Sequence, residues 1–145
     1  MKRRSGQLVD LSQVQAGFAF PSQTINLDAA EVDAYIRAVE DPSPAYRGGG
    51  AVVPPLAILA LATRGLTDLL TRHPGSTHAS QRLTILRPVP VGSTVTAELI
   101  VRTRSERRGF AALILEARVH NAAGPALEGE MLLMVPLGDG SPANG

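Results

Sequence analysis

The sequence contains no cysteine and no tryptophan, and aromatic residues make up only 3% of its 145 positions. The absence of cysteine excludes disulfide scaffolds, thiolate metal sites and a cysteine nucleophile. The net charge is only +1, from 14 Lys and Arg against 13 Asp and Glu. A chain with so little positive charge and so few rings is poorly suited to contact phosphates or stack on bases, so we expect no nucleic-acid partner.

The sequence also lacks a long apolar run. The longest, residues 51–62, is well short of the roughly 20 residues that a membrane-spanning helix needs, so we expect a buried helix and no membrane partner. The basic start, Lys2-Arg3-Arg4, is not followed by the apolar stretch of about 7–15 residues that a signal peptide requires. We therefore expect a cytoplasmic protein.

A mass of 15.2 kDa corresponds to one domain. We expect a single domain over residues 1–145, with its core at about residues 17–137 and a flexible tail at 138–145. The chain is large enough to bury a core without disulfides or a structural metal.

Two helices are predicted in the first half of the chain. Asp28 and Glu31 have the spacing of a capping box, and an apolar face at helical spacing follows until Pro42 and Pro44 end the helix near Glu40. A second, mostly apolar helix is predicted from Pro55 to Arg72. Gly65 could bend this helix, and His73-Pro74-Gly75 ends it.

The second half of the chain changes to a period of two over four consecutive segments, which predicts an antiparallel meander. Turns are expected at residues 88–93, 105–109 and 121–125. One further strand is expected within residues 17–27. The predicted fold class is α+β, with about five curved antiparallel strands beside a long central helix.

Three segments, residues 39–46, 48–55 and 87–92, together resemble the MaoC-like hotdog hydratases and dehydratases. The nearest branch is the FAS1-like dehydratase domains, and the resemblance covers about residues 18–136. It implies a hotdog fold, in which a curved antiparallel sheet wraps a central helix. It also implies reversible hydration of 2-enoyl thioesters to (3R)-hydroxyacyl thioesters.

In catalytic members of that family, the first segment reads Gly-Asp-x-Asn-Pro-x-His, and the Asp and His hold the reacting water. Asp41 matches the Asp, whereas Ser43 replaces Asn and Tyr46 occupies the His position. A His can accept and donate a proton near neutral pH, whereas a Tyr, with a typical pKa of about 10, can donate but hardly accept. The resemblance therefore implies a subunit that lacks the catalytic His and needs a partner. Asp41, Ser43 and Tyr46 are the candidate catalytic residues.

The candidate substrate-binding residues surround the start of the second helix: they are Gly48, Gly49, Gly50, Leu56 and Ala57. The reaction needs hydrogen-bond donors for the thioester carbonyl, and a helix N-terminus can supply them. Since Pro54 and Pro55 have no amide hydrogen, the donor would be Leu56 or Ala57. Simpler interpretations remain open: Asp41 as a turn residue, Tyr46 packed on the helix, and the glycines as a flexible loop.

No metal site or cofactor is predicted. His73, His78 and His120 do not have the spacing of metal ligands and are interpreted as turn or strand residues. Four arginines, Arg102, Arg104, Arg107 and Arg108, fall near a predicted hairpin tip. They are most simply a solvated turn, and the alternative is contact with the phosphates of coenzyme A or with an acyl carrier protein.

Two functions of different classes remain open. The chain is either a hydratase or dehydratase subunit, or a hotdog module that binds acyl thioesters without catalysis. An acyl-thioesterase is less well supported, because Asp68 lies too late in the central helix to be a clear catalytic carboxylate. In each case the expected ligand is an acyl-CoA or acyl-carrier-protein thioester. We expect a dimer or a higher assembly of dimers, because a lone curved sheet leaves its edges exposed. This is either a homodimer or, as the resemblance implies, a heterodimer with a catalytic hotdog subunit.

Overall fold

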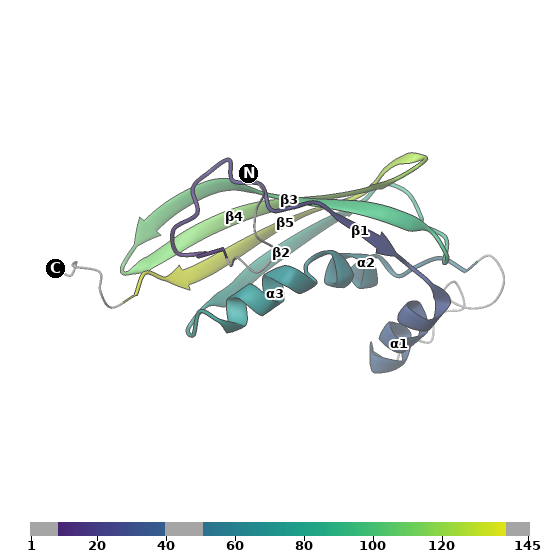
Figure 1. Cartoon of the computed structure of the whole chain (residues 1–145), viewed down its shortest axis with the longest axis horizontal. Helices are drawn as coiled ribbons and strands as arrows, with labels where there is room; N and C mark the ends of the chain where they lie inside the picture. Colours follow the sequence, from purple (N-terminus) through teal and green to yellow (C-terminus); the bar gives the residue numbers. More distant parts are fainter. Residues whose placement is uncertain (1–8, 40–50, 139–145) are drawn as a thin grey trace, which may run out of the picture.

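The computed structural model describes residues 9–39 and 51–138 (Figure 1). In this part of the chain one five-stranded antiparallel sheet carries α2 and α3 along one face, and α1 lies beyond the end of β1. The elements in chain order are β1 (Gln23–Asn26), α1 (Ala29–Val39), α2 (Pro55–Ala62), α3 (Arg64–Thr71), β2 (Thr77–Ile85), β3 (Thr94–Arg107), β4 (Phe110–Asn121) and β5 (Gly124–Pro136). The predicted α+β hotdog arrangement is confirmed.

The helix α1 begins as predicted. A carboxylate oxygen of Asp28 accepts a hydrogen bond from the amide of Glu31 at 2.9 Å, which satisfies one of the free donors of the first turn. Val32 and Ile36, on the predicted apolar face, are buried against the core.

The predicted central helix from Pro55 to Arg72 is wrong in one respect, because it is broken into α2 and α3 at Thr63. Thr63 has φ −106° and ψ 14°, and its hydroxyl donates to the carbonyl of Leu59 at 2.8 Å. Competition of this kind between a short polar side chain and the backbone favours a bend. The sequence suggested a bend at Gly65, and the structure places it two residues earlier.

The predicted meander holds only for β3, β4 and β5. The sheet order is β1-β3-β4-β5-β2, so β2 pairs with β5 rather than with β3, and the connection at residues 86–93 crosses the end of the sheet. The other side of β3 is taken by β1. The turns expected at 105–109 and 121–125 close the hairpins between β3, β4 and β5.

The first strand is shorter than predicted. Of residues 17–27, only Gln23–Asn26 form a regular strand, and Ala19 makes an isolated bridge to Ile100. Pro21 lies between these two pairings and has no amide to donate to the ladder.

Alternate residues of β4 and β5 form the centre of the core, as their sequence pattern predicted. They are Ala111, Leu113, Leu115, Ala117 and Val119 on β4, with Leu127, Gly129, Met131, Leu133 and Val135 on β5. The core also extends beyond the predicted boundary at residue 17, because Leu11 and Val14 are buried. No helix in the described part of the chain is long and apolar enough to cross a membrane.

Candidate functional site

Six of the eight predicted site residues lie outside the described residues: Asp41, Ser43, Tyr46, Gly48, Gly49 and Gly50. Their roles stay predictions. The other two, Leu56 and Ala57, lie in the first turn of α2.

Two of the sequence segments that carry the family resemblance meet in space at the start of α2. The amide of Val53 donates to the carbonyl of Val89 at 2.7 Å, and the amide of Val91 donates to the carbonyl of Ala51 at 3.0 Å. These bonds join the segment before α2 to the turn before β3. The start of α2 is therefore held by backbone hydrogen bonds to the connection that leads into β3.

The two candidate amide donors differ. Ala57 is buried, and its amide already donates to the carbonyl of Pro54 at 2.9 Å. To serve a ligand it would have to exchange that bond. The side chain of Leu56 is 51% exposed, so the first turn is open to solvent at this position. Leu56 is therefore the better-placed of the two.

An apolar cavity of about 240 Å³ lies between the bend of the central helices and the sheet. Its volume is slightly below the roughly 300–1,000 Å³ of most small-molecule sites. The walls come from α2, α3, β1, β3, β4 and the segments before β1: Val9, Phe20, Pro21, Gln23, Ala62, Thr63, Gly65, Leu66, Leu69, Ala97, Glu98, Leu99 and Ala117. Most of these residues are apolar, so the cavity is better suited to an apolar chain than to a charged group, which would lose its hydration there.

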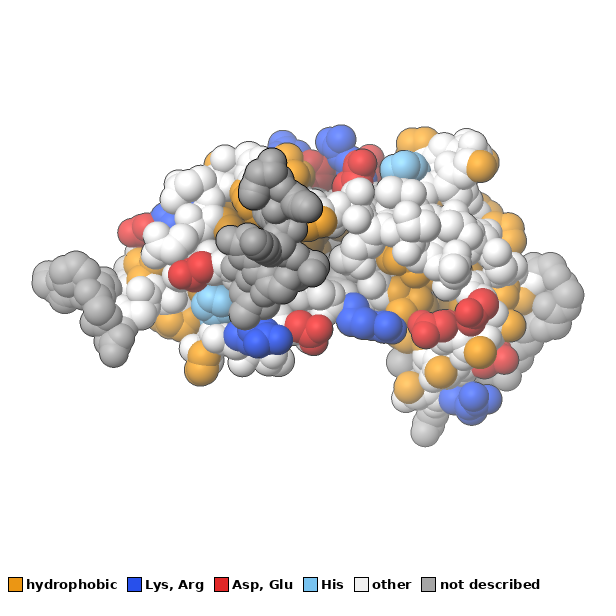
Figure 2. All heavy atoms as spheres, in the orientation of Figure 1, with side chains coloured by type: hydrophobic (Ala, Val, Ile, Leu, Met, Phe, Trp, Pro, Cys, Tyr) orange, Lys and Arg blue, Asp and Glu red, His pale blue; other side chains and the backbone are white. Residues whose placement is uncertain are grey.

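A second hollow, open to solvent, lies between α1 and α2 and is lined by residues that include Tyr35, Ala60 and Leu61. Figure 2 shows hydrophobic side chains at the surface over α2, beside α1. At its rim, Arg64 approaches Glu31 with 3.5 Å between the guanidinium nitrogen and the carboxylate oxygen. Both side chains are largely exposed, so this ion pair adds little to stability.

Each of the three histidines lies apart from the others in the fold. His73 follows α3, His78 lies at an irregularity in β2, and His120 lies near the end of β4. Among residues 9–39 and 51–138, no three His, Asp or Glu side chains gather as metal ligands. Asp68 is exposed on α3 and does not line the apolar cavity.

The four arginines near the hairpin tip do not form one cluster. A β-bulge at Arg102 changes the alternation of β3, so that Arg102 pairs with Glu116 at 2.6 Å while Arg104 reaches the carbonyl of Ser12 at 2.7 Å. Arg107 and Arg108 are exposed at the tip. Arg102 and Arg104 therefore have structural contacts, whereas Arg107 and Arg108 lie in the solvated turn that the sequence predicted.

Two carboxylates of the described chain have a perturbed acidity. The hydroxyl of Ser12 donates to Asp10 and lowers the pKa of that carboxyl, with further donation from the Ser12 amide and from His73. Hydrogen bonds from Arg102 and Arg118 lower the pKa of Glu116. Donors that favour the charged form have this effect on any carboxylate.

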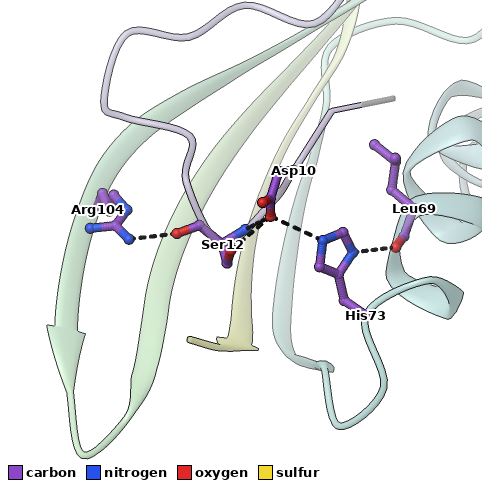
Figure 3. A network of polar contacts seen from close by, with 5 residues as sticks. All are labelled: Asp10, Ser12, Leu69, His73 and Arg104. Atoms are coloured by element: carbon purple, nitrogen blue, oxygen red, sulfur yellow. Dashed lines mark hydrogen bonds and ion pairs between the residues drawn. The ribbon is translucent and has the colours of Figure 1, made fainter. Parts of the chain in front are cut away.

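Asp10 also belongs to a polar network that the sequence did not reveal (Figure 3). The ring of His73 lies between the carbonyl of Leu69, 2.8 Å from Nδ1, and a carboxylate oxygen of Asp10, 3.2 Å from Nε2. The network joins the chain before β1 to the end of α3. No local sequence pattern indicates it, because Asp10 and His73 lie 63 positions apart.

No family model matches the sequence, and no curated protein matches it. Solved structures do match. An (R)-hydratase from A. caviae involved in PHA biosynthesis is 27% identical, with a TM-score of 0.70 over 86% of this chain and 98% of that one.

Two further structures match at lower identity. The HadBC (3R-hydroxyacyl-ACP dehydratase) complex from Mycobacterium tuberculosis is 20% identical, with a TM-score of 0.70 over 85% of this chain and 98% of that one. A MaoC-like dehydratase from Rhodospirillum rubrum is 20% identical, with a TM-score of 0.69 over 88% and 97%. The chain therefore has the hotdog fold and is a structural match, at low sequence identity, to MaoC-like (R)-hydratases and dehydratases.

Proposed function

We propose that the chain is a MaoC-like subunit of the FAS1-like branch that binds 2-enoyl or (3R)-hydroxyacyl thioesters and takes part in their hydration or dehydration. It supplies a binding site, and a partner hotdog subunit supplies the catalytic His. The observation that carries this proposal is the apolar cavity beside α2 and α3, in a chain whose Asp41 to Tyr46 loop precedes the start of α2.

The geometry of the central helices supports an acyl ligand. Ala62 is the first residue of α2 that lines the cavity. It follows Pro55 by seven residues, which at a rise of 1.5 Å per residue is about 10 Å along the helix. An acyl chain that follows α2 from a thioester carbonyl near the amide of Leu56 would have to span about this distance to reach the cavity.

The reaction assigns different tasks to the two ends of this site. Negative charge develops on the thioester oxygen as the α-carbon loses its proton, and the Leu56 amide at the start of α2 would stabilise it. Asp41 would hold the water that adds to the β-carbon. Tyr46 cannot readily take a proton at neutral pH, so a partner's His would complete the site.

A second function is favoured by one specific observation, the Tyr at position 46. A chain without a general base can still bind acyl thioesters and release them unchanged. Such a binding module would use the same cavity and the same amide donor. The two functions differ only in whether a catalytic partner joins the chain.

The decisive experiment follows hydration of a crotonyl thioester by the wild type, by Tyr46→His, and by Tyr46→His combined with Asp41→Ala. General acid–base assistance is typically worth about 10²–10⁴-fold, so Tyr46→His should raise the rate by up to that factor and Asp41→Ala should abolish the gain. The wild type should gain activity when a hotdog subunit with an intact Asp-x4-His motif is added. Rapid hydration by the wild type alone would contradict the partner requirement. If no version binds or hydrates acyl thioesters, the proposed site is wrong.

A further inference from the structure

The chain before β1 crosses one end of the apolar cavity. We call residues 9–17 the strap. Leu11 is fully buried and Val14 is 7% exposed, so the strap packs into the core. Val9, at its start, lines the cavity. The strap is therefore a wall of the cavity.

Two side-chain contacts hold the strap in place, and Figure 3 shows both. The carboxylate of Asp10 accepts hydrogen bonds from the amide of Ser12 at 3.0 Å and from the hydroxyl of Ser12 at 2.7 Å. The same carboxylate lies 3.2 Å from Nε2 of His73. From the sheet, the guanidinium of Arg104 donates to the carbonyl of Ser12 at 2.7 Å. One contact comes from the end of α3 and the other from β3, so the strap is held from both sides.

The position of these contacts shows which end of the cavity the strap closes. Helical lining of the cavity runs from Ala62 to Leu69, and Asp10 meets His73, which follows Leu69 by four residues. The strap therefore lies at the α3 end, remote from the start of α2. A chain that enters from the α2 side would meet Val9 and Leu69 last.

The residues that set the width of the cavity differ from the residue at its end. Ala62, Gly65, Ala97 and Ala117 are small and leave room around a chain. Val9 is branched and is held by the neighbouring Asp10 contact. Leu69 also lines the cavity near this end, and Val9 is the strap residue that lines it there.

We propose that Val9 is a specificity-determining residue, which forms the end wall of the apolar cavity and limits the length of the aliphatic chain that the cavity accepts. Asp10 and Arg104 are positioning residues that hold this wall. The identity of the ligand as an acyl thioester rests on the proposed function, whereas the wall itself rests only on the cavity and the strap.

The test measures the affinity of straight-chain alcohols, from butanol to decanol, for the full chain by titration calorimetry. Affinity should rise by about fourfold per buried methylene until the chain reaches the wall, and then stop rising. Val9→Ala should move that limit to a longer alcohol, and Val9→Phe should move it to a shorter one. Val14→Ala is the matched control, because Val14 is a buried valine of the same strap that does not line the cavity.

Two further variants test the positioning role of Asp10. Asp10→Ala should allow Val9 to move, so that the chain length at which affinity stops rising is no longer sharply defined. Asp10→Asn should restore the sharp limit, because the amide oxygen still accepts from Ser12. Failure of Asp10→Asn to restore this limit would overturn the positioning role.

The inference is overturned if no alcohol binds, or if the chain-length limit is the same in the wild type and both Val9 variants. A parallel series of saturated acyl thioesters separates the two proposals. If the alcohols show a limit that depends on Val9 but the thioesters do not bind, the end wall is correct and the proposed function is wrong. If the thioesters bind and their chain-length limit is the same in the Val9 variants, the proposed function is supported and the end wall is wrong.

Discussion

A Cβ atom placed on Gly129 of β5 would lie 3.5 Å from Cδ1 of Leu59 on α2. It would also lie 3.6 Å from the carbonyl oxygen of Arg82. These are ordinary contact distances with no room beyond them. A side chain larger than that of Ala at position 129 would therefore press against Leu59 of α2.

This packing predicts different outcomes for two substitutions of the same glycine. Gly129→Ala should fit, with a change in unfolding free energy within about 1 kcal/mol. Gly129→Val adds methyl groups directed at Leu59 and should destabilise by about 1–3 kcal/mol through overpacking. Urea unfolding of both variants measures the difference. A Val variant as stable as the Ala variant would show that α2 can move away from β5 at little cost.

The cap of α1 gives a second prediction. Asp28→Ala removes the acceptor of the Glu31 amide and should lower the unfolding free energy by about 1 kcal/mol. Asp28→Asn keeps a hydrogen-bond acceptor in the same place and should lower the unfolding free energy much less. Equal losses in the two variants, measured by thermal unfolding, would contradict the capping role.

The lowered pKa values of Asp10 and Glu116 predict an acid-sensitive stability. A carboxyl group whose pKa is lower in the folded than in the unfolded state stabilises the fold fully above its ordinary pKa, and this stabilisation is lost as pH falls below that value. The unfolding free energy should therefore fall as pH is lowered from about 6 to about 3.

Glu116→Gln tests the contribution of one of these groups to that pH dependence. The variant should reduce the slope of unfolding free energy against pH. Because the partners Arg102 and Arg118 are both more than half exposed, added salt should weaken the effect. A slope that is the same in Glu116→Gln and the wild type would refute this assignment.

The free edge of β2 predicts self-association. Within the described residues β2 pairs only with β5, and Ile85 and Leu86 at its end are 56% and 45% exposed. A strand edge with exposed apolar residues favours pairing with another chain. Light scattering at micromolar concentration should give a dimer or larger assembly, and Ile85→Lys should shift it toward the monomer. Ala122→Lys, in the exposed turn between β4 and β5, is the control. A wild-type monomer would contradict the prediction.

Much of the fold could be predicted from the sequence because the signals for it are local. The Asp28 cap and the alternating faces of β4 and β5 depend on residues a few positions apart. The family resemblance of the loop, with Tyr46 at the His position, can also be recognised without a structure. It supplies the hypothesis of a hydratase or dehydratase subunit that lacks the catalytic His. What these signals determine is the type of each element and which of its faces is buried.

The tertiary structure decided everything that depends on contacts between distant segments. The pairing of β2 with β5 and the bend at Thr63 changed the predicted arrangement. The bulge at Arg102 turned Arg104 toward Ser12, which lies 92 positions earlier. The strap and the cavity it closes were invisible for the same reason. A period of two specifies alternation along one strand, whereas register, bulges and strand order are set by the free energy of packing against partners that the local pattern does not name.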